Sequence, residues 1–159
     1  MIKPLAVVAL LIALPVGAQT NLVEQGRAAL DKNDLQAAVR LLESAVAQSP
    51  QNAEAHYQLG VAYGELAKKA NVFQRFSLAR HTRDEFERAV QLDPNYIDAR
   101  FALVQYYMMA PAWLGGSEAK ALEQAKEISD RDATTGHLAL AFIDARQKKS
   151  KQSAAQGAH

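Results

Sequence analysis

The side chains best suited to acid–base or metal chemistry are scattered along this chain. The four histidines stand far apart, at His56, His81, His137 and His159. None of them has a histidine partner four residues away, the spacing that places two zinc ligands on one helix face. Asp130 and Asp132 are close together, but they lie in a helix-ending turn, where a capping role explains them. The spacing predicts no metal site and no catalytic carboxylate pair.

Nucleophiles in the sequence context of an active site are also missing. The chain has no cysteine, which excludes thiolate zinc sites, iron–sulfur clusters and cysteine nucleophiles. Gly115-Gly116-Ser117 lacks the Gly-x-Ser-x-Gly frame of a nucleophile elbow. We therefore expect a protein that is not an enzyme and holds no cofactor. A hydrolase acting on cell-wall material is the more distant alternative.

The composition describes one folded domain with little net charge. The chain has 159 residues, of which 49% are hydrophobic and 22% charged, and its formal net charge is +1. This proportion of apolar residues is enough for a buried core. Nucleic-acid binding usually relies on a large basic excess, so no nucleic-acid partner is expected.

Residues 1–18 have the pattern of a secretory signal peptide. Lys3 precedes an apolar run from Leu5 to Leu14, and Val16, Gly17 and Ala18 form a small-residue cleavage site. The run is about half of the roughly 20 residues that a membrane-spanning helix needs. The pattern predicts export to the periplasm or the medium with cleavage after Ala18. An uncleaved anchor is the alternative.

The remaining sequence contains an internal repeat. Gly26, Ala38, Leu42, Ala45 and Pro50 are separated by 12, 4, 3 and 5 residues. Gly60, Thr82, Phe86, Ala89 and Pro94 are separated by 22, 4, 3 and 5 residues. The second unit is therefore the first with an insertion in its middle, and the two glycines are 34 residues apart. The prolines end the second helix of each unit, because proline cannot continue a helix.

The stretches LVEQGRAALDKNDLQAAVRLLESAVAQSPQN, HYQLGVAYGEL and FERAVQLDPNY resemble the tetratricopeptide repeat, a helical hairpin of 34 residues. The chain is similar, in particular, to exported bacterial proteins of this family with no assigned activity. The resemblance implies an all-α solenoid of about three hairpins, at residues 19–52, 53–96 with the insertion, and 97–131. A last helix at 134–147, capped by Thr134 or Thr135, and a disordered basic tail at 148–159 would complete the chain.

This family commonly binds an extended peptide or a partner helix on the concave surface formed by the first helices. Stepping along the repeat gives the residues expected there: Val23, Arg27, Tyr57, Gln58, Val61, Phe101, Gln105, Met108 and Met109. Arg27, Gln58 and Gln105 would fix the register of the partner through hydrogen bonds. The alternative is that the short array closes on itself and makes this stripe part of the core.

The insertion region carries five cations, Lys68, Lys69, Arg75, Arg80 and Arg83. No acidic residue stands between Glu65 and Asp84. One interpretation is a site for an anionic lipid or glycan at the envelope surface. The preferred interpretation is an amphipathic helix, capped by Asn71, in which the cations are solvated and the apolar residues Phe73, Phe76, Ala79 and Phe86 are buried.

Trp113 stands in the Pro/Gly-bounded segment PAWLGG that follows the third repeat's first helix. It is either a contact residue presented to a partner or, as we prefer, a plug for the gap left by a widened turn. Taken together, the residues predict an exported protein-interaction module with a protein or peptide partner. Contact with a membrane surface is part of the alternative.

Overall fold

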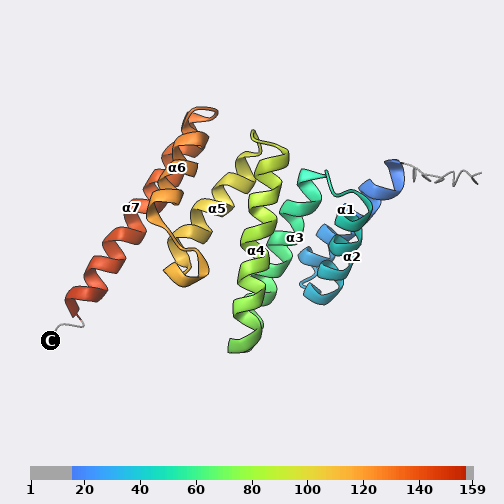
Figure 1. Cartoon of the computed structure of the whole chain (residues 1–159), viewed down its shortest axis with the longest axis horizontal. Helices are drawn as coiled ribbons and strands as arrows, with labels where there is room; N and C mark the ends of the chain where they lie inside the picture. Colours follow the sequence, from blue (N-terminus) through green and yellow to red (C-terminus); the bar gives the residue numbers. More distant parts are fainter. Residues whose placement is uncertain (1–15, 157–159) are drawn as a thin grey trace, which may run out of the picture.

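The computed structural model describes residues 16–156, and side chains from Asn21 onward. This range forms seven α-helices and one short 3-10 turn, and it contains no strand (Figure 1). The elements are α1 (Val16–Asp31), α2 (Leu35–Gln48), α3 (Ala53–Lys69), α4 (Val72–Leu92), α5 (Ile97–Met109), η1 (Ala112–Leu114), α6 (Glu118–Ser129) and α7 (Ala133–Gln156). Successive helices pack against each other along the row, which confirms the predicted all-α solenoid. Residues 1–15 of the predicted signal peptide lie outside the described residues.

In each of the first two hairpins, the two helices make their closest contact at a glycine of the first helix. A Cβ atom added to Gly26 would lie 2.5 Å from Leu42 Cγ, and one added to Gly60 would lie 2.6 Å from the Phe86 ring. Both distances are well below a van der Waals contact, so the first helix of each hairpin rests its backbone directly on a large side chain of the second. The repeat spacing therefore places a glycine opposite a large apolar residue twice.

A buried polar side chain ties each later hairpin to the turn before it. The Nε2 atom of His56 lies 3.1 Å from the Pro50 carbonyl oxygen. Arg100 Nε donates to the Pro94 carbonyl oxygen at 2.8 Å. Both residues stand six positions after the proline, so the same contact is made with two different side chains. These two bonds fix the angle at which α3 and α5 leave their turns.

The insertion lengthens the second hairpin at one end. The helix α4 has 21 residues and α2 has 14, which correspond to about 31 and 21 Å of helix. The first turns of α4 therefore reach beyond the neighbouring helices, at the lower edge of Figure 1. Asn71 caps α4 as predicted, because its side chain accepts a hydrogen bond from Gln74 N at 3.0 Å.

The last helix differs from the prediction at both ends. The helix was expected at 134–147 with a disordered tail at 148–159, whereas α7 begins at Ala133 and continues to Gln156. No proline or glycine interrupts residues 148–156, so the helix has no reason to stop earlier. The cap is Asp132, whose carboxylate accepts bonds from the backbone N–H groups of Thr134 and Thr135.

The buried apolar side chains form two clusters. The N-terminal cluster joins α1, α2 and α3 around Leu42 and Leu59. The C-terminal cluster joins α4 to α7 around Leu103 and Ile128, and Tyr57 of α3 packs against it. The helix α3 therefore has one side in each cluster. No described helix is both long enough and apolar enough to span a membrane.

Candidate partner-binding site

The first helices of the hairpins are α1, α3 and α5, and Tyr57 of α3 packs against the cluster that contains α5 and α7. The helix α1 contacts α3, and α5 contacts α7. We call the side of these helices that carries Arg27, Tyr57, Gln58, Phe101 and Gln105 the first-helix face. It corresponds to the surface that the repeat spacing predicts as a binding groove.

The predicted groove residues have three different environments. Arg27, Gln105 and Met109 are exposed and Gln58 is half-buried. The apolar members Tyr57, Val61, Phe101 and Met108 are half-buried and pack against the C-terminal cluster. Val23 is only 4% exposed and belongs to the N-terminal cluster with residues of α2 and α3. The prediction for Val23 is therefore wrong, because its side chain faces the core and not a partner.

Two tyrosine rings contact each other on the first-helix face in a tilted arrangement. The ring centroids of Tyr57 and Tyr96 are 5.0 Å apart, with an interplanar angle of 52°. Burial raises the pKa of both phenols, and the nearby Asp98 carboxylate raises both further. The Glu54 carboxylate also raises the pKa of Tyr96. Two half-buried aromatic rings thus stand next to two exposed carboxylates.

The sequence reasoning missed Tyr96, Glu54 and Asp98. Tyr96 lies in the turn before α5, outside the helical stepping pattern. Glu54 and Asp98 were detectable, because they are separated by the same 44 residues as Pro50 and Pro94. They occupy the same position in the second and third hairpins, each in the first turn of its helix.

Arg27 is engaged within the protein. Its Nη1 atom lies 3.3 Å from a Glu24 oxygen and 3.5 Å from a Glu54 oxygen, so the second pair bridges α1 and α3. The charged side chains that act on the tyrosine pair are the Glu54 and Asp98 carboxylates, opposed by the Arg27 guanidinium. This local excess of negative charge favours a cationic side chain, which can also stack on the tyrosine faces.

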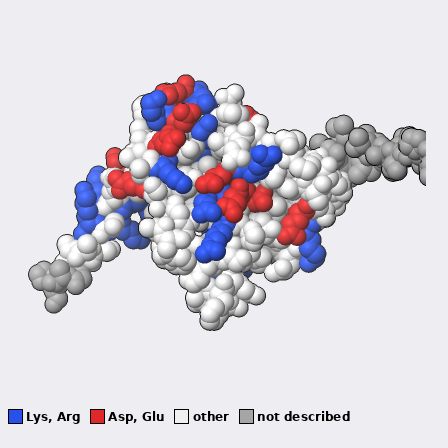
Figure 2. Space-filling view, viewed as in Figure 1, with Lys and Arg blue, Asp and Glu red and all other residues white. Residues whose placement is uncertain are grey.

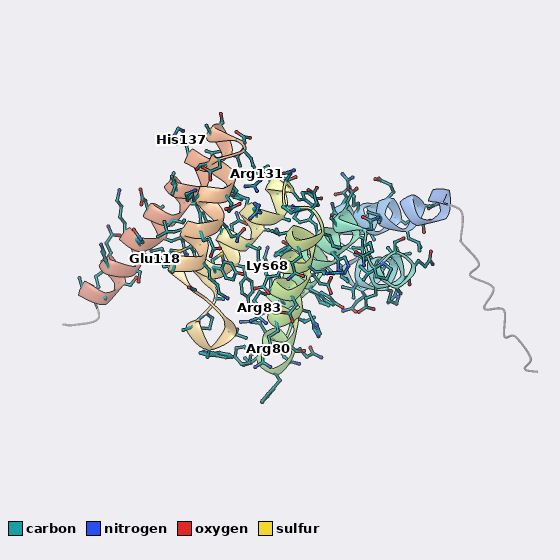
Figure 3. The ribbon with its side chains drawn as sticks, turned by 45° about the horizontal axis from the view of Figure 1, so that its top comes forward. Lys68, Arg80, Arg83, Glu118, Arg131 and His137 are labelled. Carbon is teal, nitrogen blue, oxygen red and sulfur yellow. The ribbon has the colours of Figure 1, made fainter. Side chains whose placement is uncertain are left out.

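The five cations of the second hairpin do not form one continuous patch. Lys68 pairs with Glu65 and Arg83 pairs with Asp84. Each of the two acids that flank the region therefore neutralises one of the five cations. Lys69 donates to Asn33 Oδ1 at 2.7 Å, in the turn between α1 and α2. Arg80 and Arg83 project from the lower part of α4, on the side of the loop before α6 (Figure 3). Arg80 and Arg83 therefore point away from the first repeat, whereas Lys69 points toward it.

The expected burial of the apolar residues in this region is wrong for Phe73 and Phe76. Phe73 is 90% exposed and Phe76 is 36% exposed, whereas Phe86 is buried as expected. The reason is the length of the hairpin. The first turns of α4 extend beyond the helices that would cover them.

Trp113 is also more exposed than the plug interpretation requires. It is 60% exposed, and the adjacent Leu114 is the buried residue of the loop. The Leu114 carbonyl oxygen accepts bonds from Tyr106 Oη at 2.9 Å and from Arg83 Nη1 at 3.3 Å. Gly115 follows with φ +92°, a conformation that glycine favours. The loop is therefore held in place, with Trp113 edge-on to Phe76 at 4.7 Å.

Two clefts lie beside the overhanging helix ends. One of about 740 Å³ is bounded by α2, α3 and α4 and includes Tyr63 and His81. Another of about 600 Å³ lies between the α5–α6 connection and α7 and includes Met108 and Lys149. Within residues 16–156, no three His, Asp or Glu side chains gather in a way that would hold a metal ion.

Comparison with known proteins agrees with the repeat. Residues 26–66 match the family model described as a TPR repeat, where TPR stands for tetratricopeptide repeat. These findings support the TPR family. TPR repeats generally mediate protein–protein interaction, which is the class of function that the match supports. The search of curated proteins found no match.

The fold is similar to that of a solved TPR-containing structure, described as the human IFIT1 dimer with PPP-AAAA. The TM-score is 0.54 with 17% sequence identity, over 85% of the present chain and 37% of the IFIT1 chain. At this identity the likeness concerns the fold alone. The present chain spans little more than a third of the IFIT1 chain.

Proposed function

We propose that this chain is an exported protein-interaction module that holds an extended peptide or a partner helix on its first-helix face, with no catalysis of its own. The observation that carries the proposal is the contacting pair of Tyr57 and Tyr96 rings with the Glu54 and Asp98 carboxylates close to it. The similarity of the fold to TPR solenoids supports this assignment, because the first helices of such a solenoid form an extended surface on which a peptide can bind.

The chemistry of the face defines the partner. A Lys or Arg side chain stacked on the tyrosine pair gains about 0.5–2 kcal/mol from the ring faces, and the carboxylates add charge attraction. The half-buried Phe101 and Val61 offer apolar contact on either side. Gln58 and Gln105 can hydrogen-bond the peptide backbone. We therefore propose a partner segment in which a basic residue is flanked by apolar ones.

A protein partner fits the charge better than a nucleic acid does. The formal net charge is only +1, and the first-helix face carries more acids than bases around its tyrosines. Phosphates would be repelled there. The PPP-AAAA of the IFIT1 structure is therefore not part of the proposal.

Peptide display on the full chain tests the proposed site. The selected peptides should share a basic residue next to apolar ones. Glu54→Lys combined with Asp98→Lys should weaken their binding at least about tenfold, because attraction becomes repulsion. Glu123→Lys, an exposed site on α6, is the matched control. Peptides that bind the double variant as well as the wild type would show that the site is elsewhere.

Export is tested separately by the N-terminus of the product. We expect the protein recovered outside the cytoplasm to begin at Gln19, because cleavage follows Ala18 in the predicted signal. Intact-mass spectrometry measures this directly. A product that retains Met1 would contradict cleavage.

A further inference from the structure

The end of the second hairpin carries a group of apolar side chains that the proposed partner site does not use. We call Val72, Phe73, Phe76 and Trp113 the aromatic tip. Val72 is 57% exposed, and the other three are exposed as described above. Large apolar groups exposed together on a soluble surface commonly mark a binding site. We propose that the aromatic tip inserts into the surface of an anionic lipid bilayer.

Three side chains of the tip share one side of α4, and Trp113 joins them from η1. Val72, Phe76, Arg80 and Arg83 follow each other at spacings of four, four and three residues, and Phe73 lies beside them at seven residues from Arg80. Residues at such spacings lie on one helix face. The opposite side carries Gln74, Ser77 and His81, which line the cleft with α2 and α3. Cations placed directly behind an apolar helix end can meet lipid headgroups while the apolar end enters the bilayer.

The distance between Phe73 and Arg80 along α4 matches the thickness of the headgroup layer that separates lipid phosphates from acyl chains. Phe73 and Arg80 are seven residues apart, which is about 10 Å along the helix. Apolar side chains of interfacial helices enter about 5–10 Å below the headgroups. With the tip inserted, Arg80 therefore reaches the lipid phosphates while Phe73 contacts acyl chains. Tryptophan is a residue that prefers this interface.

The charge around the tip favours an anionic surface. No acidic residue occurs between Glu65 and Asp84, and both of those are paired with cations. The segment from Ala110 to Ser117 carries no charge at all. Figure 2 shows the lower extremity of the molecule without charged side chains and a basic group above it. Anionic lipids attract such basic residues.

The tip is shaped to enter a flat surface. It stands on a helix that projects beyond its neighbours (Figure 1), and both clefts lie away from Phe73, Phe76 and Trp113. A projecting apolar end can insert into a bilayer without a groove of its own. The bonds from Tyr106 and Arg83 to the Leu114 carbonyl oxygen hold the backbone of the loop that carries Trp113.

Trp113 makes the test direct, because it is the only tryptophan of the chain. The chain that begins at Gln19 is mixed with phosphatidylcholine vesicles that contain or lack about one quarter phosphatidylglycerol. We expect its emission to shift to the blue and to be quenched by brominated lipid with the anionic vesicles. Phe73→Ser should lower vesicle binding at least about tenfold, since it removes the contact between the phenylalanine ring and the acyl chains.

Matched variants separate the tip from the rest of the chain. Leu138→Ser, which changes an apolar residue of α7 that is 59% exposed, should bind vesicles as the wild type does. Arg80→Glu should weaken binding to anionic vesicles several-fold, and Lys151→Glu, with the same change in charge at the far end of α7, should not. The wild type and all variants are prepared as the product that begins at Gln19, because the apolar run of residues 5–14 would bind lipid by itself and mask the effect of the tip.

Two results would overturn the proposal. One is that Trp113 emission stays unchanged with anionic vesicles while Phe73→Ser sediments with them as well as the wild type. The other is an emission shift that depends on protein concentration without lipid and disappears in Phe73→Ser. That result would identify the tip as a contact between two copies of the chain. Neither result bears on the first-helix face, which is tested with peptides.

Discussion

Gly60 and Gly64 stand one turn apart in α3 and face different neighbours. A Cβ atom at Gly60 would lie 2.6 Å from the Phe86 ring, whereas one at Gly64 would lie 3.5 Å from Thr82 Cγ2. We expect Gly60→Ala to lower the free energy of unfolding by about 1–3 kcal/mol, since the hairpin must open to admit a methyl group. Gly64→Ala should be neutral or stabilising by up to about 1 kcal/mol. Urea unfolding measures both, and equal effects would contradict the close contact.

Substitutions at Tyr57 and Leu59 test whether the first-helix face is exposed to solvent or is part of the core. Leu59 is 2% exposed in the N-terminal cluster, so Leu59→Ala should cost about 2–5 kcal/mol of stability. Tyr57 is half-buried, and we expect Tyr57→Ala to cost about 1–2 kcal/mol and to weaken peptide binding as well. If the two variants unfold at the same urea concentration, Tyr57 is a core residue and the face is closed.

Stepping along the repeat found Tyr57 of the proposed site but not Tyr96, Glu54 and Asp98. Stepping by the repeat finds Tyr57, Phe101 and Gln105, because helical spacing carries over from one hairpin to the next. It fails for Val23, whose side chain packs inward at the start of the row. It also misses Tyr96, because a turn residue does not follow the helix period.

At the level of single elements, the hairpins depend on their caps. Asn52 Oδ1 accepts a hydrogen bond from Ala55 N at 3.1 Å at the start of α3. Asn52→Ala should therefore lower stability by about 1 kcal/mol, whereas Asn52→Asp, which keeps the acceptor, should restore most of it. Thermal unfolding distinguishes them. A full loss in Asn52→Asp would mean that the cap is not the cause.

The projecting end of α7 is the second test at this level. Residues 148–156 are helical and exposed. Ending the chain after Gln147 should reduce the helical circular dichroism signal but move the melting temperature by less than about 3 °C, because few apolar contacts are lost. A larger drop would show that the cleft beside Met108 depends on this end.

The lengths of elements were harder to predict than their existence. The intervals 12 and 22 reveal an insertion of ten residues, but not whether it forms a loop or longer helices. In the structure it lengthens α4 at its start. The exposure of Phe73 follows from that geometry, since no neighbouring hairpin extends as far. An amphipathic pattern shows which face of a helix is apolar, but it does not show whether a neighbouring helix covers that face.

For the molecule as a whole, the tyrosines report on folding. Burial raises the pKa of all five, Tyr57, Tyr63, Tyr96, Tyr106 and Tyr107, above the ordinary value of about 10. The native protein keeps protons that the unfolded chain releases, so this part of the stability is complete below pH 10 and falls as the pH rises further. We expect tyrosinate absorbance to appear together with unfolding. A tyrosine that titrates near pH 10 in the native protein would contradict this.

The division of the core into two clusters has a consequence for how the protein opens. Because α3 places Leu59 in one cluster and Tyr57 against the other, partial opening at either end of the row still leaves one side of α3 covered. Neighbouring repeats unfold in such local steps when their own contacts are broken. The backbone amides of α3 should therefore exchange with deuterium more slowly than those of α1 and α7. The end hairpins would fray while the helix between the two clusters remains protected.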